Sequence, residues 1–402
     1  MRNKRFRRAV AAAFLLAGAA FGGGVDSHFA REALQPYVDS GELPGAISVF
    51  RRPGAEEVAC LGFADLETKR APTLDSPFMQ CSQTKGYCGV SVAILVESGR
   101  LKLDDPVSRY LPEFATLWIR NGETNGVRTS VRAQNKLTVR MCLNHTGGLP
   151  FELPNYELMG GWSRRMPLRS VAATAAALPL RFEPGTKIGY SNVGIDIAAA
   201  IVEKVSGLRW EDFLRKRIFD PLGMSATGFW PTDRQLENRI RLYTVKPGQK
   251  PVPRIDSAMQ PPFGDDRVFP SAGAGLWTTA RDQLKFYSML MNLGAGENGR
   301  RILKAETVKG LLAVSSRPKG FEGYSLGLSA PVSDGDAAWF GHGGAFGTNC
   351  MVNWHRKELK LWVVQAYGGP FPWEKARAEA AKRFFSRPVD AAGVDAYTGR
   401  MK

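Results

Sequence analysis

The chain has 402 residues, of which 44% are hydrophobic and 23% charged, and its formal net charge at pH 7 is +16. This composition excludes a largely disordered protein and is sufficient for a large core divided between two lobes. The Lys and Arg residues are spread along the whole chain rather than clustered among aromatic residues, so nucleic acid is not the expected partner. We expect a cationic surface that faces solvent.

The first 24 residues have the pattern of an export signal. Five basic residues between Arg2 and Arg8 precede an uncharged run from Ala9 to Gly24, and the small residues Ala17 to Ala20 offer a cleavage site. The run is shorter than the roughly 20 apolar residues that span a bilayer, so a membrane anchor is the weaker alternative. We expect residues 1–24 to be a signal peptide. Its removal would leave a periplasmic or secreted protein with a net charge of +11 and no stable membrane span.

Both ends of the remaining chain predict strands with helices outside them. Residues 27–40 have a helical pattern, and residues 45–67 alternate on both sides of a Pro-Gly turn, as in a β-hairpin. Near the other end, residues 348–367 form two more alternating runs, and residues 374–385 follow as a closing helix. These patterns predict an α+β protein with one antiparallel sheet built from both chain ends and flanked by helices.

The middle of the chain has a different pattern. From Pro106 to Pro231 it is helix-like and broken by Pro and Gly turns, with the clearest helical segments at residues 193–207 and 209–223. We therefore expect a mostly helical lobe inserted into the sheet domain, with a site in the cleft between the two lobes. The predicted domain covers residues 25–402, with a sheet lobe at about 25–105 and 265–390 and a helical lobe at about 106–264.

The cysteines and histidines argue against a metal site. Five cysteines are an odd number, so at least one is unpaired or bonded to another chain. Cys81 and Cys88, if they share a helix, lie about 10 Å apart along its axis, beyond the reach of a disulfide. We expect mostly buried thiols. The four histidines form no HxH or HExxH pattern, and we expect neither a metal nor another cofactor.

Ser82 and Lys85 stand three residues apart at the head of the apolar run 86–99, which predicts a buried helix that ends at Gly99. On a helix such residues share one face, so the amine can approach the hydroxyl. The helix N-terminus would add N–H groups where an oxyanion forms. An arbitrary S-x-x-K is more often a serine cap with a solvated lysine, but a lysine ahead of an apolar helix is poorly placed for solvation.

Two further short motifs follow in order. Tyr190 and Asn192 form a Y-x-N on a loop between a Pro-Gly turn and a helix, and His342 opens a His-Gly-Gly beside a strand. With these motifs and its flanking segments, the chain resembles the β-lactamase-related serine hydrolases over about residues 27–385. This superfamily includes class C β-lactamases, DD-peptidases, D-aminopeptidases and esterases. The flanking segments are CSQTKGY, ESGRLKLDDPVSRYLPEF, LNHTGGLP, FEPGTKIGYSNVG, PLGMSATGF and SAGAGLWTTARD.

The resemblance implies a role for each motif residue. Ser82 would be the acylated nucleophile and Lys85 the group that takes its proton, because an unaided serine is a weak nucleophile. Tyr190 would act as a second base or acid toward the leaving group. Asn192 would orient Lys85 and the acyl side chain of the substrate.

The third motif would bind the substrate. His342 stands where many relatives have lysine, while Gly343 and Gly344 would let the substrate lie against the strand. The N–H groups of Ser82 and Ala345 would form the oxyanion hole. With His-Gly-Gly in place of Lys-Thr-Gly, the cation that would meet a substrate carboxylate is expected to titrate near 6.5, the usual histidine pKa.

Two other matches are given structural interpretations. Ser316 and Lys319 also fit S-x-x-K, but Pro318 would obstruct a helix interior there, so this match is interpreted as accidental. His145 is expected to fix its loop rather than to take part in chemistry, although the family keeps a histidine there.

The sequence therefore predicts an exported serine hydrolase that cleaves a small ester or a D-amino-acid peptide through an acyl-Ser82 intermediate. One alternative is a cell-envelope DD-carboxypeptidase or a weak class C-like β-lactamase, which the same motifs would serve. Another is a non-catalytic relative that binds wall fragments or forms an assembly. A cell-wall origin of the substrate and the oligomeric state are left open.

Overall fold

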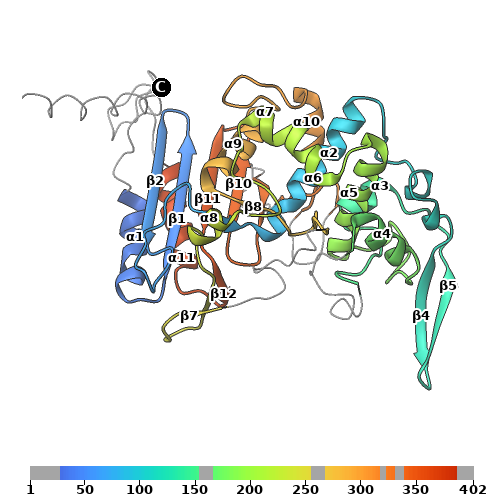
Figure 1. Ribbon diagram of the computed structural model, residues 1–402, viewed down its shortest axis with the longest axis horizontal. Helices are drawn as coiled ribbons and strands as arrows, with labels where there is room; N and C mark the ends of the chain where they lie inside the picture. Colours follow the sequence, from blue (N-terminus) through green and yellow to red (C-terminus); the bar gives the residue numbers. More distant parts are fainter. Residues whose placement is uncertain (1–27, 154–165, 255–267, 317–322, 331–338, 387–402) are drawn as a thin grey trace, which may run out of the picture.

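The computed structural model describes residues 28–153, 166–254, 268–316, 323–330 and 339–386. The predicted signal peptide, residues 1–24, lies outside them. A five-stranded antiparallel sheet has the strand order β2-β1-β11-β10-β9. Its two halves come from opposite ends of the chain, which confirms the predicted fold class (Figure 1). The strands are β1 (Gly45–Arg52), β2 (Ala55–Gly62), β9 (Phe340–Gly343), β10 (Asn349–Asn353) and β11 (Glu358–Val363).

Alternating side chains bury both faces of this sheet. On β11, Leu361 points into the main core, whereas Trp362 packs in a second cluster with residues of α1 (His28–Asp39) and α11 (Glu374–Phe385). These two terminal helices cover one face, as the sequence predicts. On the other face, α9 (Ala280–Met291) packs against β10 and β11.

Helix α2 (Thr84–Glu97) runs through the main core, and every residue from Thr84 to Leu95 is buried. It packs against α5 (Asn192–Ser206) and α10 (Ala305–Leu311), so its apolar residues find partners on all sides. The expected buried helix is therefore present, and it places Lys85 in the interior.

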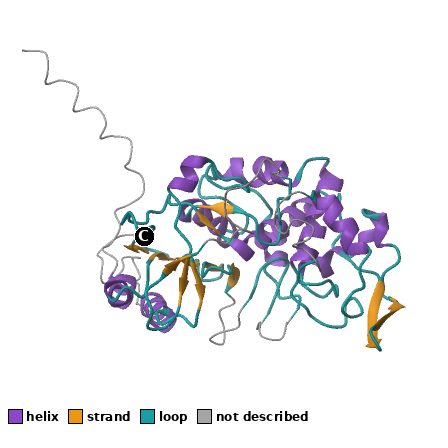
Figure 2. Ribbon diagram, turned by 60° about the horizontal axis from the view of Figure 1, so that its bottom comes forward, coloured by secondary structure: helices purple, strands orange, loops and turns teal. Residues whose placement is uncertain are grey.

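The middle of the chain is mostly helical, as expected, and helices α3 to α6 gather on the side of the molecule away from β1 and β2 (Figures 1 and 2). The expected helix at 209–223 is a run of α6, a π-helical segment at Arg215–Phe219 and α7. The shorter helices are α3 (Val139–Leu143), α4 (Leu168–Ala176), α6 (Trp210–Leu214), α7 (Asp220–Leu222) and α8 (Asp233–Glu237), with 3-10 turns at Cys81–Gln83, Val107–Arg109 and Pro112–Phe114.

One part of this region differs from the helical expectation. Strands β4 (Trp118–Thr124) and β5 (Val127–Arg132) form an antiparallel hairpin that projects from the end of the molecule (Figure 1). The cause is its turn: Asn125 and Gly126 both have positive φ, 50° and 76°, the geometry that an Asn-Gly pair favours in two-residue hairpins.

The expected helical lobe also ends earlier than residue 264. Strand β6 (Tyr243–Val245) pairs in parallel with β12 (Ala366–Gly368) and antiparallel with β7 (Val252–Pro253), so the chain has left the helices by residue 243. Two further short strands, β3 (Phe78–Met79) and β8 (Trp277–Thr278), pair directly before α2 and α9.

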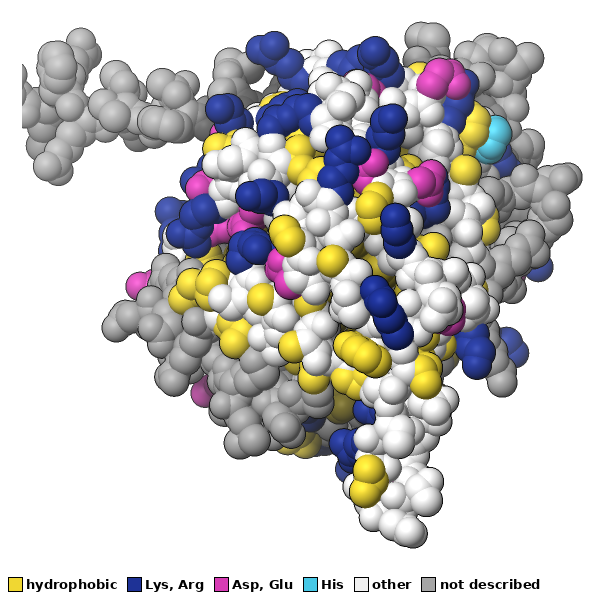
Figure 3. Space-filling model, turned by 90° about the vertical axis from the view of Figure 1, so that its right-hand side faces the viewer, with side chains coloured by type: hydrophobic (Ala, Val, Ile, Leu, Met, Phe, Trp, Pro, Cys, Tyr) yellow, Lys and Arg dark blue, Asp and Glu magenta, His cyan; other side chains and the backbone are white. Residues whose placement is uncertain are grey.

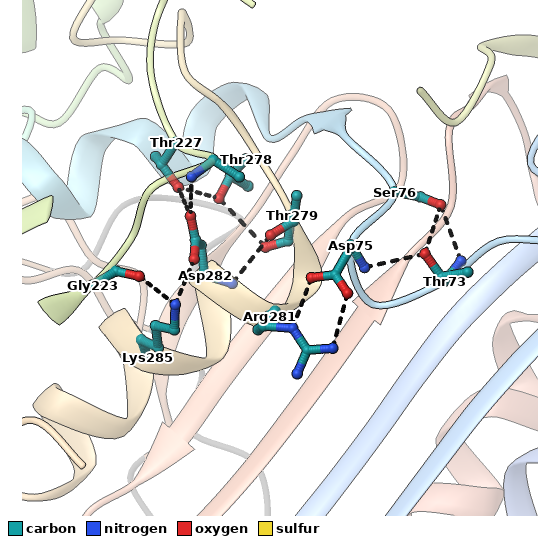
Figure 4. A network of polar contacts seen from close by, with 11 residues as sticks. Thr73, Asp75, Ser76, Gly223, Thr227, Thr278, Thr279, Arg281, Asp282 and Lys285 are labelled. Atoms are coloured by element: carbon teal, nitrogen blue, oxygen red, sulfur yellow. Dashed lines mark hydrogen bonds and ion pairs between the residues drawn. The ribbon is translucent and has the colours of Figure 1, made fainter. Parts of the chain in front are cut away.

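A polar network fixes the start of α9 (Figure 4). Asp282 accepts hydrogen bonds from the backbone N–H of Ala226 at 2.8 Å and from the Thr227 hydroxyl at 3.0 Å. Next to it, Arg281 makes a two-pronged ion pair with Asp75 at 2.7 and 2.9 Å. The network joins β8 and α9 to the loop after α7 and to the loop before β3. It thereby holds the segment that leads into α9.

The face shown in Figure 3 has many basic side chains but no single basic stripe. In Figure 3, Lys and Arg side chains are scattered over the face shown, with acidic side chains among them. No disulfide joins the five cysteines, all of which lie in the described part of the chain, and four of them are buried. Within the described ranges, no helix is both long enough and apolar enough to cross a membrane.

The close packing of α2 leads to a prediction about stability. A Cβ at Gly89 would lie 2.0 Å from the carbonyl oxygen of Leu326, whereas a Cβ at Gly310 of α10 would meet nothing within 4 Å. We expect Gly89→Ala to destabilise the protein by about 1–3 kcal/mol or more through overpacking. The matched change Gly310→Ala should stabilise it by about 0.5–1 kcal/mol. Unfolding midpoints measured in urea test both, and a common sign for the two variants would contradict this packing.

Candidate active site

Ser82 lies on a strained turn between β3 and α2. The residue before it, Cys81, has φ of 51°, a conformation that costs a side-chain-bearing residue about 1–2 kcal/mol. Ser82 is in the 3-10 turn, and α2 begins two residues later at Thr84. Cys81 is fully buried while Ser82 is partly exposed, so the turn presents the hydroxyl at the surface of the core.

The Lys85 amine is the central group of the site. Lys85 is 0% exposed, and its Nζ lies 3.0 Å from Ser82 Oγ, 2.7 Å from Asn192 Oδ1 and 2.6 Å from the Gly273 carbonyl oxygen. Burial lowers the pKa of Lys85 to about 7, against a smaller opposing effect of the Asp196 carboxylate. Near neutral pH the amine is therefore partly unprotonated.

The three partners of the amine also orient it. The oxygens of Asn192 and Gly273 can only accept hydrogen bonds, so a neutral amine gives its two hydrogens to them. Its lone pair then faces the hydroxyl of Ser82. This is the orientation that a base needs to remove the hydroxyl proton.

Tyr190 lies beside the same amine. Its ring centre is 4.7 Å from Lys85 Nζ, and its hydroxyl is 3.3 Å from His342 Nε2. The loop that carries it is held by Ser191, whose side chain caps α5 by accepting from the N–H of Gly194 at 2.9 Å. Burial raises the pKa of Tyr190, so the phenol keeps its proton at neutral pH.

His342, on the edge strand β9, is neutral rather than cationic. Its Nδ1 lies 2.6 Å from the carbonyl oxygen of Gly343, which can only accept, so Nδ1 carries the hydrogen. Its Nε2 then accepts from the hydroxyls of Tyr324 at 3.1 Å and Tyr190 at 3.3 Å. Burial and the nearby Lys85 amine lower the pKa of His342 to about 3. His342 therefore does not keep the pKa near 6.5 of an unperturbed imidazole.

The two glycines after His342 differ in what their surroundings allow. A Cβ on Gly344 would lie 2.4 Å from the carbonyl oxygen of Gln80, so only glycine lets this strand end approach the Ser82 turn. A Cβ on Gly343 would make only ordinary contacts, the nearest at 3.6 Å. The protein itself does not require glycine at 343, which agrees with the expectation that substrate lies there. Ala345 follows directly, and its N–H remains a predicted oxyanion donor.

Asp196 and Gly273 were not expected from the sequence. The Asp196 carboxylate, on α5, accepts from the backbone N–H of Ala272 at 2.7 Å, that of Gly273 at 3.1 Å and the Ser271 hydroxyl at 3.3 Å. It thereby holds the turn whose Gly273 carbonyl meets Lys85. Burial raises the pKa of Asp196 to about 7. The sequence signal that could have identified Asp196 is an acidic residue within the otherwise apolar run of α5.

His145 positions the loop of Tyr190. Its Nδ1 accepts from the backbone N–H of Ser191 at 3.2 Å, and its ring centre lies 4.4 Å from those of both Tyr190 and Tyr324. Burial is the main cause that lowers the pKa of His145 well below its usual value, so the ring is neutral. The geometry agrees with a loop-fixing residue.

The structure describes only the serine of the second S-x-x-K match. The Ser316 hydroxyl donates to the carbonyl oxygen of Asn144 at 2.9 Å. Lys319 lies outside the described residues. Ser316 thus has a structural contact of its own, whereas Ser82 faces a buried amine.

A serine at 3.0 Å from a buried, oriented amine, with a tyrosine beside it, is an arrangement suited to acyl transfer. The family model described as Beta-lactamase matches residues 30–378, and the chain belongs to this family.

Among curated proteins, the chain is 25% identical to lovastatin esterase of Penicillium rubens over 316 residues, covering 74% of this chain and 75% of the relative. It is 31% identical to penicillin-binding protein 4 of Amycolatopsis lactamdurans over 269 residues, covering 65% and 63%. The structure of simvastatin synthase (LovD) from Aspergillus terreus has a TM-score of 0.74 at 20% identity and covers 91% of this chain and 100% of that chain. The two curated relatives support serine-hydrolase-type activity, whereas the solved structure shows the shared fold.

The buried carboxylate of Asp196 leads to a prediction about pH. Its charge raises the pKa of Lys85, so Asp196→Asn should lower that pKa further. If neutral Lys85 is the base, kcat/KM for a neutral ester rises with pH through the Lys85 pKa, about 7 in the native protein. This rising limb should move to lower pH in Asp196→Asn.

The control is Ser271→Ala, which keeps the carboxylate but removes one hydrogen bond that favours its charged form. Its limb should move in the same direction as that of Asp196→Asn but by less. A limb that stays in place in Asp196→Asn, or moves to higher pH, would show that the carboxylate does not act on the base electrostatically.

Proposed function

We propose that this protein is a serine hydrolase that cleaves small esters or D-amino-acid peptides through an acyl-enzyme on Ser82. The observation that carries the proposal is the Lys85 amine, 3.0 Å from Ser82 Oγ, buried, with a pKa near neutrality and its lone pair directed at the hydroxyl. A lysine kept for solubility or packing alone would not need this environment.

The first half of the reaction forms the acyl-enzyme. Ser82 Oγ attacks the substrate carbonyl carbon while its proton passes to neutral Lys85. The oxyanion that results accepts hydrogen bonds from the N–H groups of Ser82 and Ala345, which is worth about 3 kcal/mol of barrier per donor. When the tetrahedral intermediate collapses, the leaving group takes the proton of Tyr190, and Lys85 returns its proton to the phenol.

The second half releases the acyl group. Water attacks the acyl-Ser82 carbonyl while its proton passes through Tyr190 to neutral Lys85. When the tetrahedral intermediate collapses, the bond to Ser82 Oγ breaks and Lys85 returns the proton to Oγ, which releases the acid and restores the enzyme. His342 accepts a hydrogen bond from Tyr190 and so keeps the phenol in place between these steps. No step requires a metal or another cofactor.

Related enzymes support an ester or peptide substrate, because the chain resembles both an esterase and a penicillin-binding protein. The alternative of a DD-carboxypeptidase or weak β-lactamase is less well supported, since neutral His342 supplies no cation for the carboxylate of such substrates. A non-catalytic relative that binds wall fragments would have no use for an activated Ser82.

Covalent labelling tests the proposal. A fluorophosphonate probe should label the native protein, and Ser82→Ala should abolish labelling and lower kcat for 4-nitrophenyl butanoate by about 10⁴-fold or more. Ser316→Ala, the matched control from the second S-x-x-K, should keep the label. Native-like circular dichroism of Ser82→Ala excludes misfolding.

The opposite pattern, with label lost from Ser316→Ala and kept in Ser82→Ala, would identify the wrong serine. Absence of labelling and turnover in the native protein would favour the non-catalytic alternative. Rapid hydrolysis of nitrocefin or of D-alanyl-D-alanine peptides, with slow ester turnover, would favour the cell-envelope peptidase or β-lactamase.

We also propose that the protein is exported and that residues 1–24 are removed. The support is the basic segment and the following apolar run of the sequence. N-terminal sequencing of the protein from its native host should find a chain that begins near Val25. A membrane-free protein that still begins with Met1 would be incompatible with this proposal.

A further inference from the structure

Two phenols share one acceptor in the candidate active site. With its hydrogen on Nδ1, the neutral His342 ring presents a single lone pair, which lies on Nε2. The hydroxyl oxygen of Tyr324 is 3.1 Å from this nitrogen, and that of Tyr190 is 3.3 Å from it. Because a hydrogen bond weakens when its donor leaves the direction of the lone pair, the two tyrosines compete for Nε2.

Tyr324 is held more firmly than Tyr190. It is fully buried, and its ring centre lies 4.4 Å from that of His145 and 5.8 Å from that of His342, to which it stands edge-on. Its backbone N–H donates to the carbonyl oxygen of Ser316 at 2.6 Å, and its carbonyl oxygen accepts from the N–H of Ser316 at 3.0 Å. Tyr190 is partly exposed on the loop before α5. The packing therefore fixes the hydroxyl of Tyr324 at Nε2 and leaves that of Tyr190 freer to turn.

The proposed reaction requires the proton of Tyr190 to move. During acylation the O–H bond of Tyr190 breaks, the leaving-group atom takes this proton, and the Lys85 ammonium donates its own proton to the phenolate oxygen. His342 accepts a hydrogen bond throughout and gains no proton. A full-strength hydrogen bond from Tyr190 to Nε2 would oppose the transfer, because that bond must be broken before the proton can be directed at the substrate.

We propose that Tyr324 is a positioning residue, which occupies the lone pair of His342 and thereby keeps the proton of Tyr190 available to the leaving group. Tyr324 itself does not touch the substrate and exchanges no proton. This inference rests on the proposed function and specifies how its general acid is kept ready. Tyr324 should matter for alkyl esters and amides, whose leaving groups must be protonated, and little for esters whose leaving group departs as a stable anion.

Three esters with one acyl group test this role: 4-nitrophenyl, phenyl and ethyl butanoate, whose leaving groups are increasingly basic. Their common deacylation step does not enter kcat/KM, which covers the steps through acylation. Tyr324→Phe removes one hydroxyl and keeps the ring, so Tyr190 should then donate to Nε2 at full strength. We expect kcat/KM for ethyl butanoate to fall by about tenfold, that for phenyl butanoate by less, and that for 4-nitrophenyl butanoate to change little.

A double-mutant cycle shows whether Tyr324 acts through His342. In a His342→Ala background no lone pair remains to compete for, so adding Tyr324→Phe should not change the ratio of ethyl to 4-nitrophenyl kcat/KM. The matched control is Tyr110→Phe, which removes a hydroxyl that donates to Asp105, beyond the C-terminal end of α2. It should keep the native ratio. Fluorophosphonate labelling of Ser82 in Tyr324→Phe at close to the native rate verifies that the nucleophile and its base are in place, because fluoride leaves without a proton.

A second measurement does not depend on the folding of Tyr324→Phe. The ¹⁵N chemical shift of His342 Nε2 reports the hydrogen bond that this nitrogen accepts. If Tyr324 holds the lone pair, Tyr190→Phe should leave this shift close to its native value. A large change of the shift in Tyr190→Phe would show that Tyr190 is the principal donor and would overturn the inference.

Four kinetic results would also overturn this inference alone. They are native ester ratios in Tyr324→Phe, an equal loss for all three esters, the same change of ratio in the His342→Ala background, and a native enzyme that cleaves 4-nitrophenyl but not ethyl butanoate. An equal loss would mean that Tyr324 only supports packing. In each case labelling of Ser82 and turnover of 4-nitrophenyl butanoate by the native enzyme would leave the proposed function standing. Absence of both would overturn the proposed function and this inference with it.

Discussion

The burial of one amine is the constraint on which the rest of the site depends. Lys85 can stay in the interior because three oxygens surround its Nζ, and these come from the turn of Ser82, from α5 and from the turn at Gly273. Each of these segments has its own support: a close approach of Gly344, a capped helix at Ser191, and a buried carboxylate. Loss of any one of these segments would remove one of the three hydrogen-bond partners of the buried Lys85 amine, which is costly in the interior.

The parts of the fold that follow from local pattern could be predicted from the sequence. Alternating apolar and polar residues at both chain ends predict the strands of the sheet, and the continuous apolar run after Lys85 predicts the buried helix α2. Each pattern reflects which faces of the element are buried. The hairpin after Trp118 was missed although Asn125-Gly126 was a readable turn signal. It carries few buried side chains, so its hydrophobic pattern was weak.

The site was predictable in its residues but not in its charges. The motifs indicated Ser82, Lys85 and Tyr190, which the fold brings together, yet the charge of His342 depends on burial and on an amine far away in sequence. Histidine in a pattern that often contains lysine suggested a cation. Only the tertiary contacts, with one tyrosine on either side of Nε2, show that the ring serves as an acceptor.

The same contacts explain how one lysine can be both buried and reactive. The carboxylates of Asp196 and Glu152 both stabilise the charged form of Lys85 electrostatically. Burial favours the neutral amine, and the two carboxylates oppose it, so the balance falls near neutral pH. A stronger carboxylate contact would keep the amine protonated, and a protonated amine cannot act as a base. Without any nearby carboxylate, the amine would be unable to hold the proton that the leaving group later needs.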